Sequence, residues 1–175
     1  YDSAIKLLKP LAKQRNVDSN SWLADKGCYD SVIKLVKPLA EQGNADAQFW
    51  LGKCFVEKGD YESAMKWLTL AANKGNTDAQ LLLGICFLGK GDYDSAIEWL
   101  KPFAEKGNVL AQISLGTCFV EKGEYDSAIK LVKPFAEQGN SDAQLVLGRC
   151  FFGKGEYDSA IKWLKPLAEQ GNTDA

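Results

Sequence analysis

Cysteine is the residue type in this chain whose spacing could support chemistry, because thiols bind metals and form disulfides. The chain has five cysteines, and four of them recur at one constant interval, at Cys54, Cys86, Cys118 and Cys150. Disulfide frameworks and zinc sites use cysteines paired at short spacings, often together with histidine. This chain has no Cys-x-x-Cys motif and no histidine. The pattern favours cysteine as a small buried apolar residue, with redox or metal binding as the alternatives.

The sequence also lacks the other signatures of an active site. It contains no histidine base, no nucleophile motif, no phosphate-binding loop and no isolated pair of carboxylates in an apolar setting. Its acidic residues fall at expected helix starts and in loops, where the helix dipole and solvent account for them. We therefore predict that the protein is not an enzyme, and we expect no cofactor and no metal.

Composition and charge narrow the class of partner. The chain has 175 residues, of which 46% are apolar and 25% charged, and its net charge is −2. Binding to nucleic acid through phosphate contacts needs a basic surface, so we expect no nucleic-acid partner. No apolar run reaches the roughly 18 residues of a transmembrane helix, so no membrane span is expected. No targeting segment is visible at the start of the sequence.

The cysteine spacing belongs to a repeat that runs through the whole chain. A tyrosine recurs with the same 32-residue period at Tyr29, Tyr61, Tyr93, Tyr125 and Tyr157. A fixed period of this size is typical of a solenoid, in which each unit buries its apolar face only against its neighbours. Solenoids act through long surfaces, which directs the search for function away from a single catalytic pocket.

One repeat, residues 45–76, reads as two helices joined by a short turn. Apolar residues recur every three or four positions over residues 46–58 and again over residues 61–74. We call these helix A and helix B and expect Asp46 and Asp60 to cap their starts. Gly59 and Gly75 suit their left-handed ends. The short link requires the two helices to be antiparallel neighbours.

Glycine and proline inside the expected helices need a physical reason. A glycine in the middle of each helix A predicts a close approach to helix B, where Ala64, Ala96, Ala128 and Ala160 would supply a small matching surface. Gly89 and Gly153 are expected to loosen the last turn of two A helices. Four prolines lie within B helices, at Pro38, Pro102, Pro134 and Pro166. Each frees the carbonyl of a charged residue four positions earlier, so we expect these carbonyls to be hydrated on an outer wall.

Three motifs in each unit point to a known family. They are LGxCF in helix A, then G-D/E-Y-x-x-A, then A-E-Q-G-N-x-D-A-Q where two units join. The chain resembles the Sel1-like repeat, a relative of the tetratricopeptide repeat, although its short A–B link is closer to the latter. The resemblance implies an all-α, right-handed α-solenoid of antiparallel helix hairpins that serves as an adaptor or scaffold. The segment PLAEQGN is similar to that of bacterial members, which implies a bacterial protein that is cytoplasmic, periplasmic or secreted.

The domain prediction is a single α-solenoid array over residues 1–175. Its units are a partial one at 1–16, a shortened one at 17–44, and full units at 45–76, 77–108, 109–140 and 141–172. The shortened unit lacks about one helical turn of helix A. This deletion is either tolerated drift near an end or a hinge or notch for a partner.

The resemblance and the helical spacing place helix A on the concave face, where a partner would bind. The predicted exposed inner positions are Phe49, Lys53, Val56, Leu81, Ile85, Leu88, Ile113, Thr117, Val120, Leu145, Arg149 and Phe152. Two of the three columns are wholly apolar, which suits an amphipathic helix or an extended peptide. The alternative is that tight curvature buries part of these columns between neighbouring repeats.

A second hypothesis is structural. Neither end of the repeat array carries a polar cap, so the sequence is either a segment of a longer array or an array whose ends stack on other copies. A head-to-tail contact that does not close would give a filament. The predicted partners are therefore a protein or peptide, including other copies of the same chain.

Overall fold

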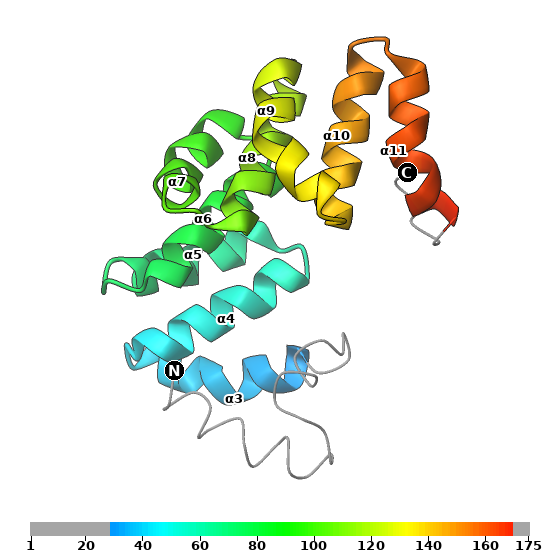
Figure 1. Ribbon diagram of the computed structural model, residues 1–175. Coiled ribbons are helices and arrows are strands. Elements are labelled where there is room, and N and C mark those ends of the chain that lie inside the picture. The colour runs from blue at the N-terminus through cyan, green and yellow to red at the C-terminus, as the bar shows by residue number, and fades with distance from the viewer. Residues whose placement is uncertain (1–28, 170–175) are drawn as a thin grey trace. The chain divides into compact units, whose positions relative to one another are not determined.

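The computed structural model describes residues 29–169, and within that range it contains nine helices and no strand (Figure 1). The predicted all-α helical repeat is confirmed. The described part divides after Lys90 into two compact units. The predicted short helix A of the 17–44 unit and both predicted uncapped chain ends lie outside the described residues, whereas helix B of that unit is described.

The first unit alternates B and A helices along the chain. Its helices are α3 (Tyr29–Glu41), α4 (Ala45–Glu57), α5 (Tyr61–Ala72) and α6 (Thr77–Gly89). Each helix packs on the next, and the A helices α4 and α6 also contact each other. The A helices therefore form the inner layer of this unit, with α3 and α5 packed outside it.

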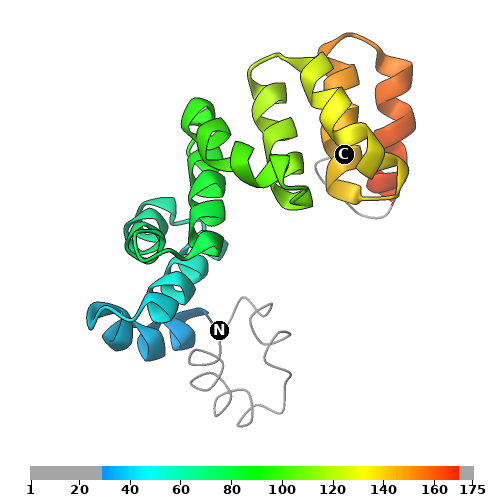
Figure 2. The same cartoon turned by 60° about the vertical axis from the view of Figure 1, so that its left-hand side comes forward.

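The second unit follows the same plan, and both views show α9, α10 and α11 side by side (Figures 1 and 2). Its helices are α7 (Tyr93–Glu105), α8 (Val109–Glu121), α9 (Tyr125–Glu137), α10 (Ser141–Gly153) and α11 (Tyr157–Glu169). Consecutive helices pack together, and the A helices α8 and α10 contact each other as well. The helix bounds agree closely with those predicted.

The caps at the helix starts correct one prediction. Asp46 does not cap α4, because the cap is Asn44, whose side chain accepts a hydrogen bond from the Ala47 amide at 2.9 Å. An asparagine caps α6, α8 and α10 in the same way. Asp60 caps α5 as predicted, by accepting from the Ser63 amide at 3.1 Å. A residue at the N-cap satisfies backbone donors that the helix leaves free.

The helix ends follow the glycine pattern. Gly59 has φ of 73°, its amide donates to Val56, and the Asp60 amide donates to Phe55. This pair of bonds is a Schellman motif, which needs a residue in the left-handed conformation and therefore favours glycine. The prolines lie inside the B helices and are exposed, as are the charged residues four positions earlier, such as Lys34 and Lys130.

The mid-helix glycine does allow helix A to approach helix B, but the partner differs from the prediction. A Cβ placed on Gly52 would lie 2.5 Å from Cγ of Leu68, and at Gly148 it would meet Leu164. The glycine therefore accommodates a large side chain one turn beyond the predicted alanine. Ala64 and its equivalents are buried beside this contact. Close packing of this kind explains why glycine stands in the middle of a helix.

Candidate protein-binding surface

The twelve predicted inner positions differ in how far solvent reaches them. Phe49, Ile113 and Val120 are buried, whereas Arg149 is exposed and Phe152 is 63% exposed. The remaining seven are half-buried: Lys53, Val56, Leu81, Ile85, Leu88, Thr117 and Leu145. Part of both apolar columns is thus buried, and the role of these columns in binding a partner stays a prediction.

In the first unit the predicted positions join an aromatic cluster on α4. The rings of Phe49 and Trp50 meet edge to face with centroids 5.6 Å apart, and both are buried. The ammonium of Lys53 lies 5.2 Å from the centroid of Trp50. This cation–π contact holds Lys53 against the helix. Phe49 therefore serves the core, and Lys53 presents a positive charge above it.

In the second unit the structure brings three predicted residues into one hollow. This α8–α10 hollow has a volume of about 580 Å³. It is lined by Val120, Glu121, Tyr125, Arg149, Phe152, Gly153 and Leu164. The inner columns supplied Val120, Arg149 and Phe152, but the others were missed. Tyr125 and Gly153 could have been found from the repeat, because the last turn of helix A covers the tyrosine that begins the preceding helix B.

One ion pair sits among the apolar walls of the α8–α10 hollow. The Arg149 guanidinium donates to the Glu121 carboxylate, and the Tyr93 hydroxyl donates to the other oxygen of Glu121 at 3.5 Å. Phe152 and Val120 provide apolar surface beside this pair. The site thus offers an apolar wall next to fixed charges, which is the usual make-up of a recognition surface.

A ladder of exposed ion pairs joins successive repeats on the outside of each unit. A lysine after each A helix binds the acidic residue near the start of the preceding B helix, as in Lys58–Asp30 at 2.6 Å and Lys154–Asp126 at 2.8 Å. The hydrogen bond from Lys58 lowers the pKa of Asp30, and the hydrogen bond to Asp126 raises the pKa of Lys154. Exposed pairs of this kind add little stability, but their regular spacing favours one register of stacking.

The glycines at the end of α6 and α10 correct another prediction. Both helices continue to their glycine, so the last turn is not loosened. A Cβ on Gly89 would lie 2.4 Å from the ring of Tyr61, and one on Gly153 would lie 2.4 Å from the ring of Tyr125. Each glycine therefore makes room for the tyrosine of the preceding repeat.

The comparison with known families agrees with this geometry. The family model of the tetratricopeptide repeat matches residues 28–75, 69–108 and 113–175. The chain belongs to the tetratricopeptide repeat family. No curated protein matches the chain. The two units described above are therefore stacks of tetratricopeptide helix pairs.

Solved structures of other proteins show the same helical-repeat fold. A crystal structure of MamA is 25% identical, with a TM-score of 0.66, covering 83% of this chain and 90% of MamA. A putative kinesin light chain of Podosopora anserina with nearly identical TPR-like repeats is 14% identical, with a TM-score of 0.67, covering 94% of this chain and 93% of its own. A Sel1 repeat protein from Oxalobacter formigenes superposes less well: it is 29% identical, with a TM-score of 0.46, covering 81% of this chain and 45% of its own.

Membership of the tetratricopeptide repeat family sets the general class of function. Folds of this kind typically mediate interactions between proteins and are generally non-catalytic scaffolds. Among the helices that the structure describes, none is both long and apolar enough to cross a membrane.

The cysteines of the tetratricopeptide helices serve the core. Cys54, Cys86, Cys118 and Cys150 are all buried and free, as predicted. Burial raises the pKa of Cys54 to about 12 and that of Cys150 to about 11. A thiol with so high a pKa stays protonated near neutral pH and is a poor nucleophile. Within residues 29–169, no group of three or more metal-binding side chains comes together.

Proposed function

We propose that the protein is a non-enzymatic interaction scaffold that holds a protein or peptide partner against its A helices. In the second unit the anchor point would be the α8–α10 hollow. The observation that carries this proposal is the exposure of Phe152 beside the Arg149–Glu121 pair. Aromatic residues and arginine are the residue types enriched at protein interfaces, and Phe152 and Arg149 supply both here.

The geometry favours a short apolar anchor with polar groups on either side of it. Phe152, Val120 and Leu164 can receive an aliphatic or aromatic side chain of the partner. A backbone N–H of the partner can then donate to the Glu121 carboxylate, and a backbone C=O can accept from the Arg149 guanidinium. Such an arrangement fits an amphipathic helix or an extended segment laid along the A helices.

Site-directed photocrosslinking tests this proposal. Benzoylphenylalanine at position 152 should crosslink to a partner in cells, and the Phe152→Ser chain should compete poorly for that partner. Leu70 on α5 is the matched control position, because it is also an exposed apolar residue but belongs to a B helix. Equal crosslinking from positions 152 and 70 would remove the support for the α8–α10 hollow as an anchor.

Self-association is the second candidate function, and a specific surface favours it. This end face consists of Phe152, Tyr157, Ala160, Ile161, Leu164 and Lys165, and it encloses a hollow of about 300 Å³. Tyr157 is 60% exposed, whereas an A helix of the next repeat covers the equivalent Tyr61 and Tyr125. An A helix of a second copy would cover the end face in the same manner.

Light scattering across a concentration series tests self-association. If copies stack through the end face, the apparent mass rises with concentration, and Ile161→Glu abolishes the rise by placing a charge in the interface. Ile161 lines the end face but not the α8–α10 hollow, whereas Phe152 lines both. A crosslink from position 152 to a second copy of the chain should therefore disappear in Ile161→Glu, and a crosslink to a different protein should persist. A constant monomer mass would leave the peptide scaffold as the sole proposal.

A further inference from the structure

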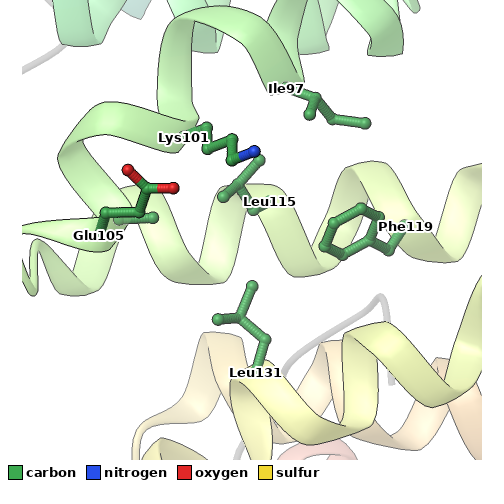
Figure 3. Close-up of a pocket in the computed structure, with 7 residues that line it drawn as sticks. Ile97, Lys101, Glu105, Leu115, Phe119 and Leu131 are labelled. Carbon is green, nitrogen blue, oxygen red and sulfur yellow. The ribbon is translucent and has the colours of Figure 1, made fainter.

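Another cavity of the second unit lies between α7, α8 and α9. It has a volume of about 510 Å³, within the range of small-ligand pockets. Figure 3 shows Leu131 pointing from α9 toward Leu115 of α8, with Lys101 of α7 reaching in from the opposite side. The remaining lining residues are Ile97, Ala104, Glu105 and Phe119. We call this the Leu131 cavity.

The repeat supplies two internal comparisons for the Leu131 cavity. One repeat later in the chain, the other six lining positions hold the same residue types: Ile129, Lys133, Ala136, Glu137, Leu147 and Phe151. Two repeats earlier they do so again: Ile33, Lys37, Ala40, Glu41, Leu51 and Phe55. The position of Leu131 is the one that differs, because it is Trp163 in the later set and Trp67 in the earlier set.

The tryptophans of those two sets pack on the core at their position in the repeat. Trp163 is half-buried against the cluster of the second unit, together with Phe151 and Ile129. Trp67 is half-buried against the cluster of the first unit, together with Phe55 and Ile33. The same six residue types thus surround a tryptophan side chain in two of the three sets and a leucine side chain in the third.

The exposure of the cavity floor follows this difference. Leu115 is 5% exposed, whereas Leu51 and Leu147 are fully covered. Ala104 is 7% exposed, whereas Ala40 and Ala136 are 1% exposed. Among these three sets, the floor is covered where the column holds Trp67 or Trp163 and is open where it holds Leu131. The cavity therefore has the same apolar residues that pack around an indole in the other two sets.

We propose that the Leu131 cavity binds the tryptophan side chain of a partner polypeptide. The apolar floor of Leu115, Phe119 and Ile97 receives the ring. The Glu105 carboxylate at the rim accepts the indole N–H, which needs an acceptor when it is buried. The Lys101 ammonium lies at the rim, where a cation is attracted to the face of an indole. A lysine–tryptophan contact of this type occurs elsewhere in the protein, between neighbouring residues of α5, where the Lys66 ammonium lies 5.7 Å from the Trp67 centroid.

This site is separate from the A-helix surface of the proposed function. It is built on two B helices and one A helix, and it shares no lining residue with the α8–α10 hollow. The two proposals therefore fail independently. Phe152→Ser should leave tryptophan binding at the Leu131 cavity unchanged.

The test uses N-acetyl-5-fluorotryptophanamide as the probe, observed by fluorine NMR with the full chain. We expect the wild-type protein to bind one equivalent, and we expect N-acetylleucinamide to compete poorly. Leu131→Trp fills the cavity from within, so it should weaken probe binding by about tenfold or more and raise Tm. If Leu131→Trp still binds the probe, or lowers Tm, the cavity does not accept an indole and the proposal is wrong.

A second variant makes the opposite change, from tryptophan to leucine, at the equivalent position of the next repeat. Trp163→Leu opens a second cavity with the same lining, so the bound probe should rise from one equivalent to two. Its fold is checked by circular dichroism, and Trp67→Leu replaces it if it does not fold. Unchanged stoichiometry in a folded variant would overturn the proposal. Binding of free fluoroindole without binding of the amide would also overturn it, because the occupant would then be a small molecule and not a polypeptide.

Discussion

Tyr125 and Tyr157 occupy the same place in the repeat but have opposite surroundings. Both stand in an identical segment, Glu-Tyr-Asp-Ser-Ala-Ile-Lys, at residues 124–130 and 156–162. The ring of Tyr125 lies against Gly153 of α10, whereas Tyr157 is 60% exposed. The local sequence determines the helix and the face that is apolar. What covers that face is decided by the helix that follows.

This comparison explains how one repeat sequence can serve both as core and as interface. In a solenoid each repeat uses one surface to bind the repeat that follows it. At the edge of an array the same surface is exposed, and a partner can bind there. The covered copy around Tyr125 therefore predicts the shape of whatever binds around Tyr157. Substitutions that affect the surroundings of Tyr125 and of Tyr157 differently test this comparison most directly.

The largest expected effect comes from the helix that covers Tyr125. Leu147 of α10 is fully buried, so Leu147→Ala should lower the free energy of unfolding by about 2–5 kcal/mol. Ile161 lies on the exposed end face, so Ile161→Ala should change it by no more than about 0.5 kcal/mol. Urea unfolding followed by circular dichroism measures both. A comparable loss at Ile161 would mean that the end face is covered in solution.

Much of this architecture could be predicted from the sequence, because local rules determine it. The period, the helix pairs, the left-handed glycines and the buried cysteines all depend on residues within one repeat. The cap was misassigned to Asp46 because Asn44 and Asp46 are both good caps and their order in the turn decides between them.

The candidate sites were harder to predict, because they depend on packing between repeats. The burial of Phe49, Ile113 and Val120 follows from how closely neighbouring A helices approach, which the period alone does not state. The Leu131 cavity had a visible signal, namely a leucine in a column that holds tryptophan in three other repeats, at Trp67, Trp99 and Trp163. Leu35 is the other leucine of that column, and the walls that would face it lie outside the described residues.

A medium effect is expected where the tyrosine is covered. Gly153→Ala places a Cβ against the Tyr125 ring, and such overpacking costs about 1–3 kcal/mol. In the Tyr125→Ala background the same Gly153→Ala change should cost much less, since the added Cβ then has no ring to clash with. The double-mutant cycle is measured by urea unfolding. Additive losses in the double variant would show that the ring does not lie on Gly153.

The smallest effect is expected from the ion-pair ladder that links α10 to α9. The hydrogen bond to Asp126 raises the pKa of Lys154, so the folded state holds this proton more tightly than the unfolded chain does. The resulting stability is fully present below the ordinary lysine pKa of about 10.4 and is lost as the pH rises through the higher folded-state value. Both side chains are solvent-exposed, so salt should screen the pair as well.

Lys154→Met removes the ion pair with Asp126 and leaves the contact between Gly153 and Tyr125 in place, so it measures the contribution of the ion pair. At pH 8 and low salt its Tm should lie slightly below that of the wild type, and the two should converge at strongly alkaline pH and in 1 M salt, where the Debye length is about 3 Å. Lys130→Met on α9 is the matched control, because Lys130 is exposed but lies outside the ladder. A Tm difference that persists under both conditions would mean that the Lys154 side chain acts by packing. Its alkyl chain, and not its charge, would then help hold α10 over Tyr125.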